Sequence, residues 1–229
     1  MNTRGLLDQL LKSGQELLNK QGGASKPAAG SGGLGSLLSG AGGGALGAGA
    51  LGLLLGNKKA RKYGGKVITY GGLAALGVLA YKAYGNWQAR QGAGQGAEPQ
   101  TLDRLPPAQV EQHSQAVLRA LVAAAKSDGH IDDRERALIE GEFTRLDSDR
   151  ELQHWLHAEL NKPLDPAEVA RAAQTPEMAA EMYLASLMMV DQENFMERAY
   201  LDELARQLRL DPALRQELES QARLAAAGQ

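Results

Sequence analysis

The chain has no cysteine among its 229 residues, which excludes disulfides, thiol nucleophiles and thiolate metal sites. Aromatic residues make up only 4% of the sequence, so few large rings are present to build a core. Neither the alternation of apolar and polar residues typical of a strand nor a two-residue hairpin turn is found, so no sheet is expected. The sequence therefore predicts an all-α protein.

Composition divides the chain into two unlike halves. Residues 1–97 hold 25 of the 28 glycines and eleven basic residues, but Asp8 and Glu16 are their only acids. Residues 98–229 carry fourteen basic and twenty-five acidic residues, so the two halves have net charges of +9 and −11. A basic front half is typical of a segment that faces a membrane or a nucleic acid. The back half is long enough for one packed domain.

The first 62 residues predict a membrane-directed region without a core of its own. Residues 1–20 carry leucine pairs at helical spacing among charged residues, which predicts an amphipathic helix. Residues 21–62 form a Gly-rich linker that contains a charge-free run at 33–56. Small residues recur every fourth position in that run, and such ridges let helices associate in a bilayer; they are Gly40, Gly44, Ala48, Gly52 and Gly56. The alternative is a disordered Gly-rich segment.

Residues 63–87 predict a transmembrane helix. The stretch from Val67 to Tyr81 has no charge, and Tyr and Trp residues stand near both ends of the span, as in interfacial aromatic belts. The alternative is a buried helix of a soluble domain, for which the front half offers no packing partners. With the run at 33–56, the chain has one or two predicted spans.

A linker at residues 88–104 leads into a predicted helical domain at 105–229. Apolar periodicity predicts helices near residues 108–127, 138–146 and 152–160. Asp165-Pro166, Thr175-Pro176 and Asp211-Pro212 each have the form of a helix start, with an N-cap before proline. The run from Met178 to Val190 is the most apolar of this half and predicts the central helix.

One pattern occurs twice in the domain. The segment Asp128-Gly129-His130-Ile131-Asp132-Asp133-Arg134-Glu135-Arg136-Ala137 is matched by Asp191-Gln192-Glu193-Asn194-Phe195-Met196-Glu197-Arg198-Ala199. In each copy an apolar run ends at an Asp, a polar turn follows, and Glu-Arg-Ala opens the next helix. The repeat predicts two related helix–turn–helix corners.

These acidic corners have two readings. Asp132 with Glu135, and Asn194 with Glu197, have the spacing of capping boxes, which need no ligand. Capping does not explain Asp128 and Asp191, which precede the caps. If the corners meet, Asp128, Asp132, Glu135, Asp191 and Glu197 could bind a divalent cation such as calcium through carboxylate oxygens. An EF-hand is excluded, because its twelfth position would be Ile139.

Other candidate sites are weaker. His154 and His157 share a helical face, but no third metal ligand follows at a suitable spacing, and surface histidines are expected. No nucleophile–base set is visible, so no enzyme and no catalytic residue is predicted. The basic residues at 58–66 lie between two apolar runs, where anionic lipid is a simpler partner than nucleic acid. No nucleic-acid partner is therefore expected.

The stretch from Ala124 to Asp132, followed by Glu135-Arg136, resembles the signature of the TerB-like fold named for tellurite-resistance proteins. The Gly-rich front, the apolar span and Asn194-Phe195-Met196-Glu197-Arg198 are similar to the YebE-type inner-membrane proteins of Gram-negative bacteria, a family of unknown function. The resemblance implies an all-α TerB-like domain whose acidic corners are candidates for cation binding. Gln192 departs from the Asp-Gly opening of the first corner and weakens a two-corner metal site.

Two functions are therefore expected as alternatives. The first is a non-enzymatic, membrane-anchored interaction or stress-response module of the bacterial inner membrane, with membrane lipid, protein partners and Gly-mediated homo-oligomers. The second is a divalent-cation sensor that uses the acidic corners near Asp128 and Asp191. The side of the membrane stays open: the basic residues before the second span favour a domain outside the cytoplasm, whereas TerB-like relatives are mostly cytoplasmic.

Overall fold

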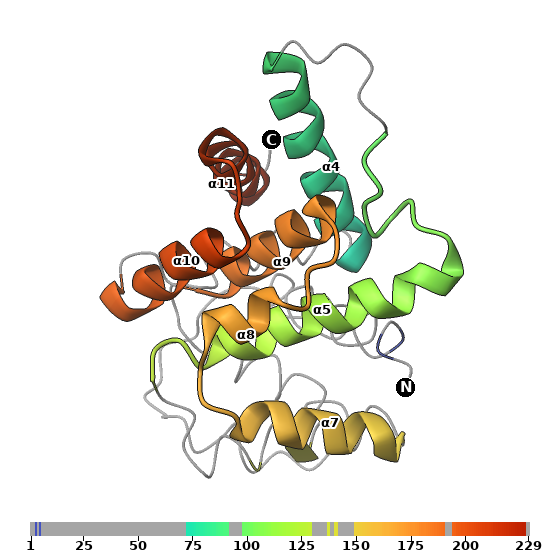
Figure 1. The fold of residues 1–229 in the computed structure, drawn as a ribbon, viewed down its shortest axis with the longest axis vertical. Coiled ribbons are helices and arrows are strands. Elements are labelled where there is room, and N and C mark those ends of the chain that lie inside the picture. The colour runs from blue at the N-terminus through green and yellow to red at the C-terminus, as the bar shows by residue number, and fades with distance from the viewer. Residues whose placement is uncertain are drawn as a thin grey trace, which may run out of the picture.

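The computed structural model describes residues 72–91, 98–129, 149–190 and 194–227, together with Thr3, Gly5, Ala137, Glu140 and Gly141. Within these residues the regular structure is helical and no strand occurs, as predicted (Figure 1). The helices are α4 (Gly72–Arg90), α5 (Pro107–Ala125), α7 (Arg150–Asn161), α8 (Pro166–Ala170), α9 (Pro176–Met189), α10 (Phe195–Gln207) and α11 (Pro212–Ala227).

Helix α9 is the centre of the bundle. All its residues from Met178 to Met189 are buried, and α4, α5, α10 and α11 pack around it. A helix buried on every side is mostly apolar all round, which is why its run of mainly apolar residues identified it in the sequence. The prediction of a central helix at this position is confirmed.

The predicted helix starts are also confirmed, because each depends on neighbouring residues alone. The Asp165 carboxylate accepts a 2.9 Å hydrogen bond from the backbone N–H of Ala167. The Thr175 hydroxyl accepts one of 3.1 Å from the N–H of Met178 at the start of α9. Asp211 accepts one of 2.8 Å from Ala213 at the start of α11. Each side chain satisfies an N–H group that has no partner within its helix.

Helix α4 belongs to the same core as the helices of the back half. Leu76, Ala80 and Ala83 are buried in one cluster with residues of α5, α9 and α11. Figure 1 shows α4 beside α11 and against the start of α9. The back half therefore supplies the packing partners that the front half lacks.

A membrane-crossing helix is not among the helices of the described residues, none of which is both long enough and apolar enough. Of the span predicted at 63–87, residues 63–71 lie outside the described residues, and residues 72–87 lie in α4. The described part of the predicted span packs as a buried helix of the bundle, which was the alternative to a membrane span. Its polar end is also bound by the bundle, since Trp87 donates a 3.1 Å hydrogen bond to Asp211.

A short turn at residues 101–104 closes over α4 at Gly77. An added Cβ at Gly77 would lie 2.6 Å from Oδ1 and 2.9 Å from the backbone N of Asp103. The turn is held by a 2.6 Å hydrogen bond from Thr101 Oγ1 to Asp103 Oδ1, and the Arg104 guanidinium lies 3.9 Å from the centre of the Tyr81 ring. Glycine is required here because the turn backbone touches the helix backbone.

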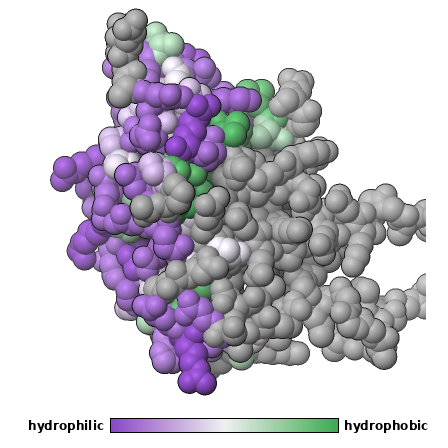
Figure 2. All heavy atoms as spheres, turned by 90° about the vertical axis from the view of Figure 1, so that its right-hand side faces the viewer, coloured by the Kyte–Doolittle hydropathy of each residue, from purple (hydrophilic) through white to green (hydrophobic). Residues whose placement is uncertain are grey.

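Several predicted elements lie wholly or mostly outside the described residues: the amphipathic helix at 1–20 except Thr3 and Gly5, the linker at 21–62, and the helix near 138–146 except Glu140 and Gly141. From the first of these, Thr3 is buried and its N–H donates a 2.6 Å hydrogen bond to Glu111 of α5. On the face drawn in Figure 2, the described side chains are mostly hydrophilic. Their distribution is that of a bundle whose apolar residues face inward.

Candidate functional site

The described parts of the two related corners approach each other at Gly129 and Met196. Gly129, at the end of the turn that follows α5, has a φ of 84°, and its N–H donates to the Lys126 carbonyl oxygen. An added Cβ on Gly129 would lie 3.5 Å from Cε of Met196, in the first turn of α10. We call Gly129, Phe195 and Met196 the corner surface. The helix–turn–helix repeat thus brings residues more than sixty positions apart into contact.

Of the five predicted carboxylates, the structure describes two. Asp128 is half-buried and Glu197 is buried, at 5% exposure. Asp132, Glu135 and Asp191 lie outside the described residues. Within the described part of the chain, no group of three or more His, Asp or Glu side chains is arranged to hold a metal ion. The cation site therefore stays a prediction.

The second corner contains the expected N-cap. The Asn194 side-chain oxygen accepts a 2.9 Å hydrogen bond from the N–H of Met196 and so fixes the first turn of α10. The two residues after the cap are strongly exposed, with 76% of Phe195 and 54% of Met196 open to solvent. The sequence marked this segment as a motif, but it gave no sign that both apolar side chains face outward.

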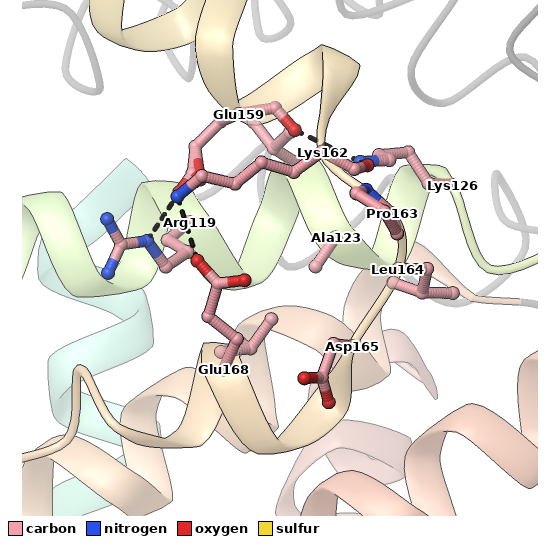
Figure 3. Close-up of a pocket in the computed structure, with 11 residues that line it drawn as sticks. Arg119, Ala123, Lys126, Glu159, Lys162, Pro163, Leu164, Asp165 and Glu168 are labelled. Atoms are coloured by element: carbon pink, nitrogen blue, oxygen red, sulfur yellow. Dashed lines mark hydrogen bonds and ion pairs between the residues drawn. The ribbon is translucent and has the colours of Figure 1, made fainter.

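A second cluster, shown in Figure 3, is centred on the buried carboxylate of Glu159. It receives hydrogen bonds of 2.8 Å from Arg119 Nε and 3.0 Å from Lys162 Nζ, and Lys162 also bonds Glu168 at 2.8 Å. These carboxylates raise the pKa of Lys162, and the Lys162 hydrogen bond lowers the pKa of Glu168. Lys126 donates to the backbone carbonyls of Glu159 and Lys162.

This cluster has a structural role. Both of its carboxylates are ion-paired, and the adjoining cavity of about 20 Å³ has room for no more than a water molecule. The side chains come from α5, α7, α8 and the segment after α7, so their ion pairs join these three helices. Glu159 and Lys162 stand at i,i+3 spacing, but the sequence could not show that Arg119 and Glu168, from other segments, would join them.

A buried carboxylate–imidazole pair lies between α5 and α9. Glu181 is fully buried; it accepts a 2.5 Å hydrogen bond from the Leu102 N–H and lies 3.1 Å from Nδ1 of His113. Burial raises the pKa of Glu181, because the charged form is poorly solvated there. The pair holds the turn at 101–104 onto the bundle and is closed to solvent, so it is unsuited to reaction with a substrate.

A cavity of about 720 Å³ lies where α4, the α8–α9 segment and the α10–α11 turn meet. Its walls include Tyr84, Trp87, Ala170, Ala179, Leu208 and Leu214. The Tyr84 and Trp87 rings lie edge to face, with centroids 5.1 Å apart. The Trp87 hydrogen bond to Asp211 fixes the indole.

Two arginines, Arg171 and Arg209, line the same cavity. Arg209 is the residue after Leu208, the C-cap of α10, and it has a φ of 54°. There Arg209 N donates to Arg206 O and Leu210 N donates to Ala205 O, both at 3.1 Å. This is a Schellman motif, whose left-handed position is usually glycine. A residue other than glycine in this left-handed conformation destabilises the fold by about 1–2 kcal/mol. The cavity could not be predicted from the sequence, because three separate segments of the chain form it.

Comparison with known proteins identifies a family but no activity. The family described as "Protein of unknown function (DUF533)" matches residues 40–222. A protein of Yersinia enterocolitica, described as "Uncharacterized protein in ampR 5'region", is 35% identical over 126 residues, which are 55% of this chain and 89% of that protein. No solved structure matches the chain.

Proposed function

The chain belongs to the DUF533 family, whose function is unknown, and we propose that it is a non-enzymatic, membrane-anchored interaction module of the bacterial inner membrane. In this proposal the domain is TerB-like, the layout is that of the YebE-type proteins, and the module acts in a stress response. The helical bundle binds a protein partner, and the segment before Gly72 contacts membrane lipid.

The observation that carries the proposal is the corner surface. Phe195 and Met196 are neighbouring apolar side chains, exposed by 76% and 54%, on a helix turn fixed by the Asn194 cap. Aromatic residues and methionine are enriched in protein interfaces, where a rigid anchor loses little entropy on binding. Burying both side chains in an apolar pocket of a partner would remove them from water.

Membrane attachment is supported by the chain that precedes α4. The charge-free run at 33–56 suits the hydrocarbon interior of a bilayer. The basic residues at 58–66 suit a region of anionic headgroups beside it. The family match begins at residue 40, inside this run. The small-residue ridge from Gly40 to Gly56 would then join copies of the chain.

Photo-crosslinking in cells tests the partner-binding role. A photoreactive amino acid at position 195 should give one adduct of defined mass, because Phe195 would lie inside the interface. The same amino acid at Leu224, which is 43% exposed on α11, is the control and should give none. Equal labelling from both positions, or none from position 195, would remove the support for the corner surface.

Carbonate extraction tests the membrane anchor. The full-length chain should stay in the membrane pellet, whereas a chain that begins at Gly72 should be released. Release of the full-length chain would contradict the anchor and leave the partner-binding role untouched.

A cation sensor is the second candidate, because the contact of Gly129 with Met196 joins the two corners that carry Asp128 and Glu197. A cation that binds the folded state alone raises the melting temperature by mass action. Millimolar calcium or magnesium should then raise the melting temperature relative to chelator, and Asp128→Asn should abolish the rise. Equal melting temperatures of the wild type in all three conditions would exclude this candidate.

A further inference from the structure

We propose that the 720 Å³ cavity between α4, the α8–α9 segment and the α10–α11 turn binds a small phosphate monoester with an apolar body. The site is independent of the partner-binding role, because none of the corner surface lines the cavity. It would give the protein a small-molecule ligand.

The size and walls of the cavity suit such a ligand. Pockets for small molecules usually have volumes of about 300–1,000 Å³ and combine apolar walls with polar groups that fix the orientation, and the exposed lining of this cavity is about equally polar and apolar. Here Trp87, Ala179 and Leu214 provide apolar wall, and the cavity is open to solvent on one side. An aromatic or alkyl body can therefore lie against the indole while its charged end stays near the rim.

The charge at the rim identifies the ligand as an anion. Arg171 and Arg209 both have exposed side chains, and within the described part of the chain neither guanidinium is ion-paired with a carboxylate. Arg119 and Arg206, by contrast, are each bonded to a glutamate. Asp211 lines the cavity, but it already accepts hydrogen bonds from Trp87 and Ala213.

A phosphate monoester carries nearly two negative charges at neutral pH and three acceptor oxygens. Two guanidinium groups match that charge, and each can donate a pair of parallel hydrogen bonds to phosphate oxygens. A doubly charged headgroup therefore fits this pair of arginines better than a neutral polar group would.

The backbone of Arg209 is a second, independent observation. Glycine is the usual residue at the left-handed position of a Schellman motif, yet this chain, with its 28 glycines, has an arginine there. An unfavourable backbone conformation that persists at the rim of a cavity indicates that the side chain has a role. Arg209→Gly should therefore separate binding from folding.

The test uses the full-length chain with Trp155→Phe. This substitution leaves Trp87, in the cavity wall, as the single tryptophan, so the fluorescence reports on the cavity. Phenyl phosphate should change Trp87 fluorescence saturably. Inorganic phosphate and phenol, which each supply half of the ligand, should bind at least about tenfold more weakly. Phenol binding as tightly as phenyl phosphate would overturn the proposal.

The variants test the two arginines in the same background. Arg209→Gly should weaken phenyl phosphate binding about tenfold or more, and should raise the melting temperature by roughly 2–4 °C because the backbone strain is removed. Arg171→Ala should weaken binding similarly. Arg198→Ala removes an exposed arginine of α10 away from the cavity and should leave affinity unchanged. Unchanged affinity in Arg209→Gly, or an equal loss in Arg198→Ala, would overturn the proposal.

Discussion

Asn86 of α4 donates a 2.7 Å hydrogen bond from Nδ2 to Oε1 of Glu217 on α11, although the two residues are 131 positions apart in the chain. The Glu217 side chain is buried, and it also accepts a 2.9 Å hydrogen bond from Gln221 and forms a 3.2 Å ion pair with Arg90. A carboxylate with these donors binds the end of α4 to the last helix of the bundle.

Glu217→Gln should lower stability in a way that depends on pH. The Asn86 hydrogen bond lowers the pKa of Glu217 below its ordinary 4.5, so its charged form stabilises the fold above that pH. This contribution is lost as the pH falls through the lowered pKa. The melting temperatures of wild type and variant should therefore differ most at neutral pH and converge in acid. A difference that is constant with pH would contradict this account of Glu217.

Glu181→Gln should have the opposite pH dependence. Burial raises the pKa of Glu181 above 4.5, so wild-type stability falls as the pH rises through the raised value. Glutamine stays neutral and can still accept the hydrogen bond from Leu102 N–H. In urea unfolding the variant should match the wild type in acid and exceed it at neutral pH. Lower stability of the variant at neutral pH would mean that a charged pair with His113 dominates instead.

Asn194→Ala should destabilise the fold by about 1 kcal/mol, because it removes the oxygen that accepts from Met196 N–H at the start of α10. Asn194→Asp keeps a competent cap and serves as the matched control, with little expected loss. Both values can be measured by urea unfolding at neutral pH. An aspartate variant as unstable as the alanine variant would show that the Asn194 amide has a role other than capping.

The sequence predicted those parts of the fold that depend on local or periodic signals. The caps at Asp165, Thr175 and Asn194 bond N–H groups two or three residues away, so a short motif suffices to recognise them. Helix α9 is buried on all sides, and its mostly apolar run of residues marked it as central.

The sequence could not predict what depends on distant contacts. Apolar periodicity alone does not distinguish a buried helix from a membrane span, and the residues that bury α4 come from the far end of the chain. The ion pairs of Glu159 and the cavity beside Arg209 each combine segments that lie apart in the sequence. Of the acidic corners, the sequence predicted the cap at Asn194, but the contact of Gly129 with Met196 required the structure.

The packing of α4 into the bundle is tested directly by substitutions at two glycines of that helix, Gly77 and Gly85. Gly77→Ala adds a Cβ 2.6 Å from Asp103 Oδ1 and should destabilise the fold by about 1–3 kcal/mol, because the turn at 101–104 must move. Gly85→Ala meets nothing within 4 Å and should stabilise the fold by about 0.5–1 kcal/mol through helix propensity. Thermal unfolding of the full-length chain should therefore give melting-temperature shifts of opposite sign. Equal stabilisation by both substitutions would show that Asp103 does not press on Gly77 and would contradict the packing of α4 described above.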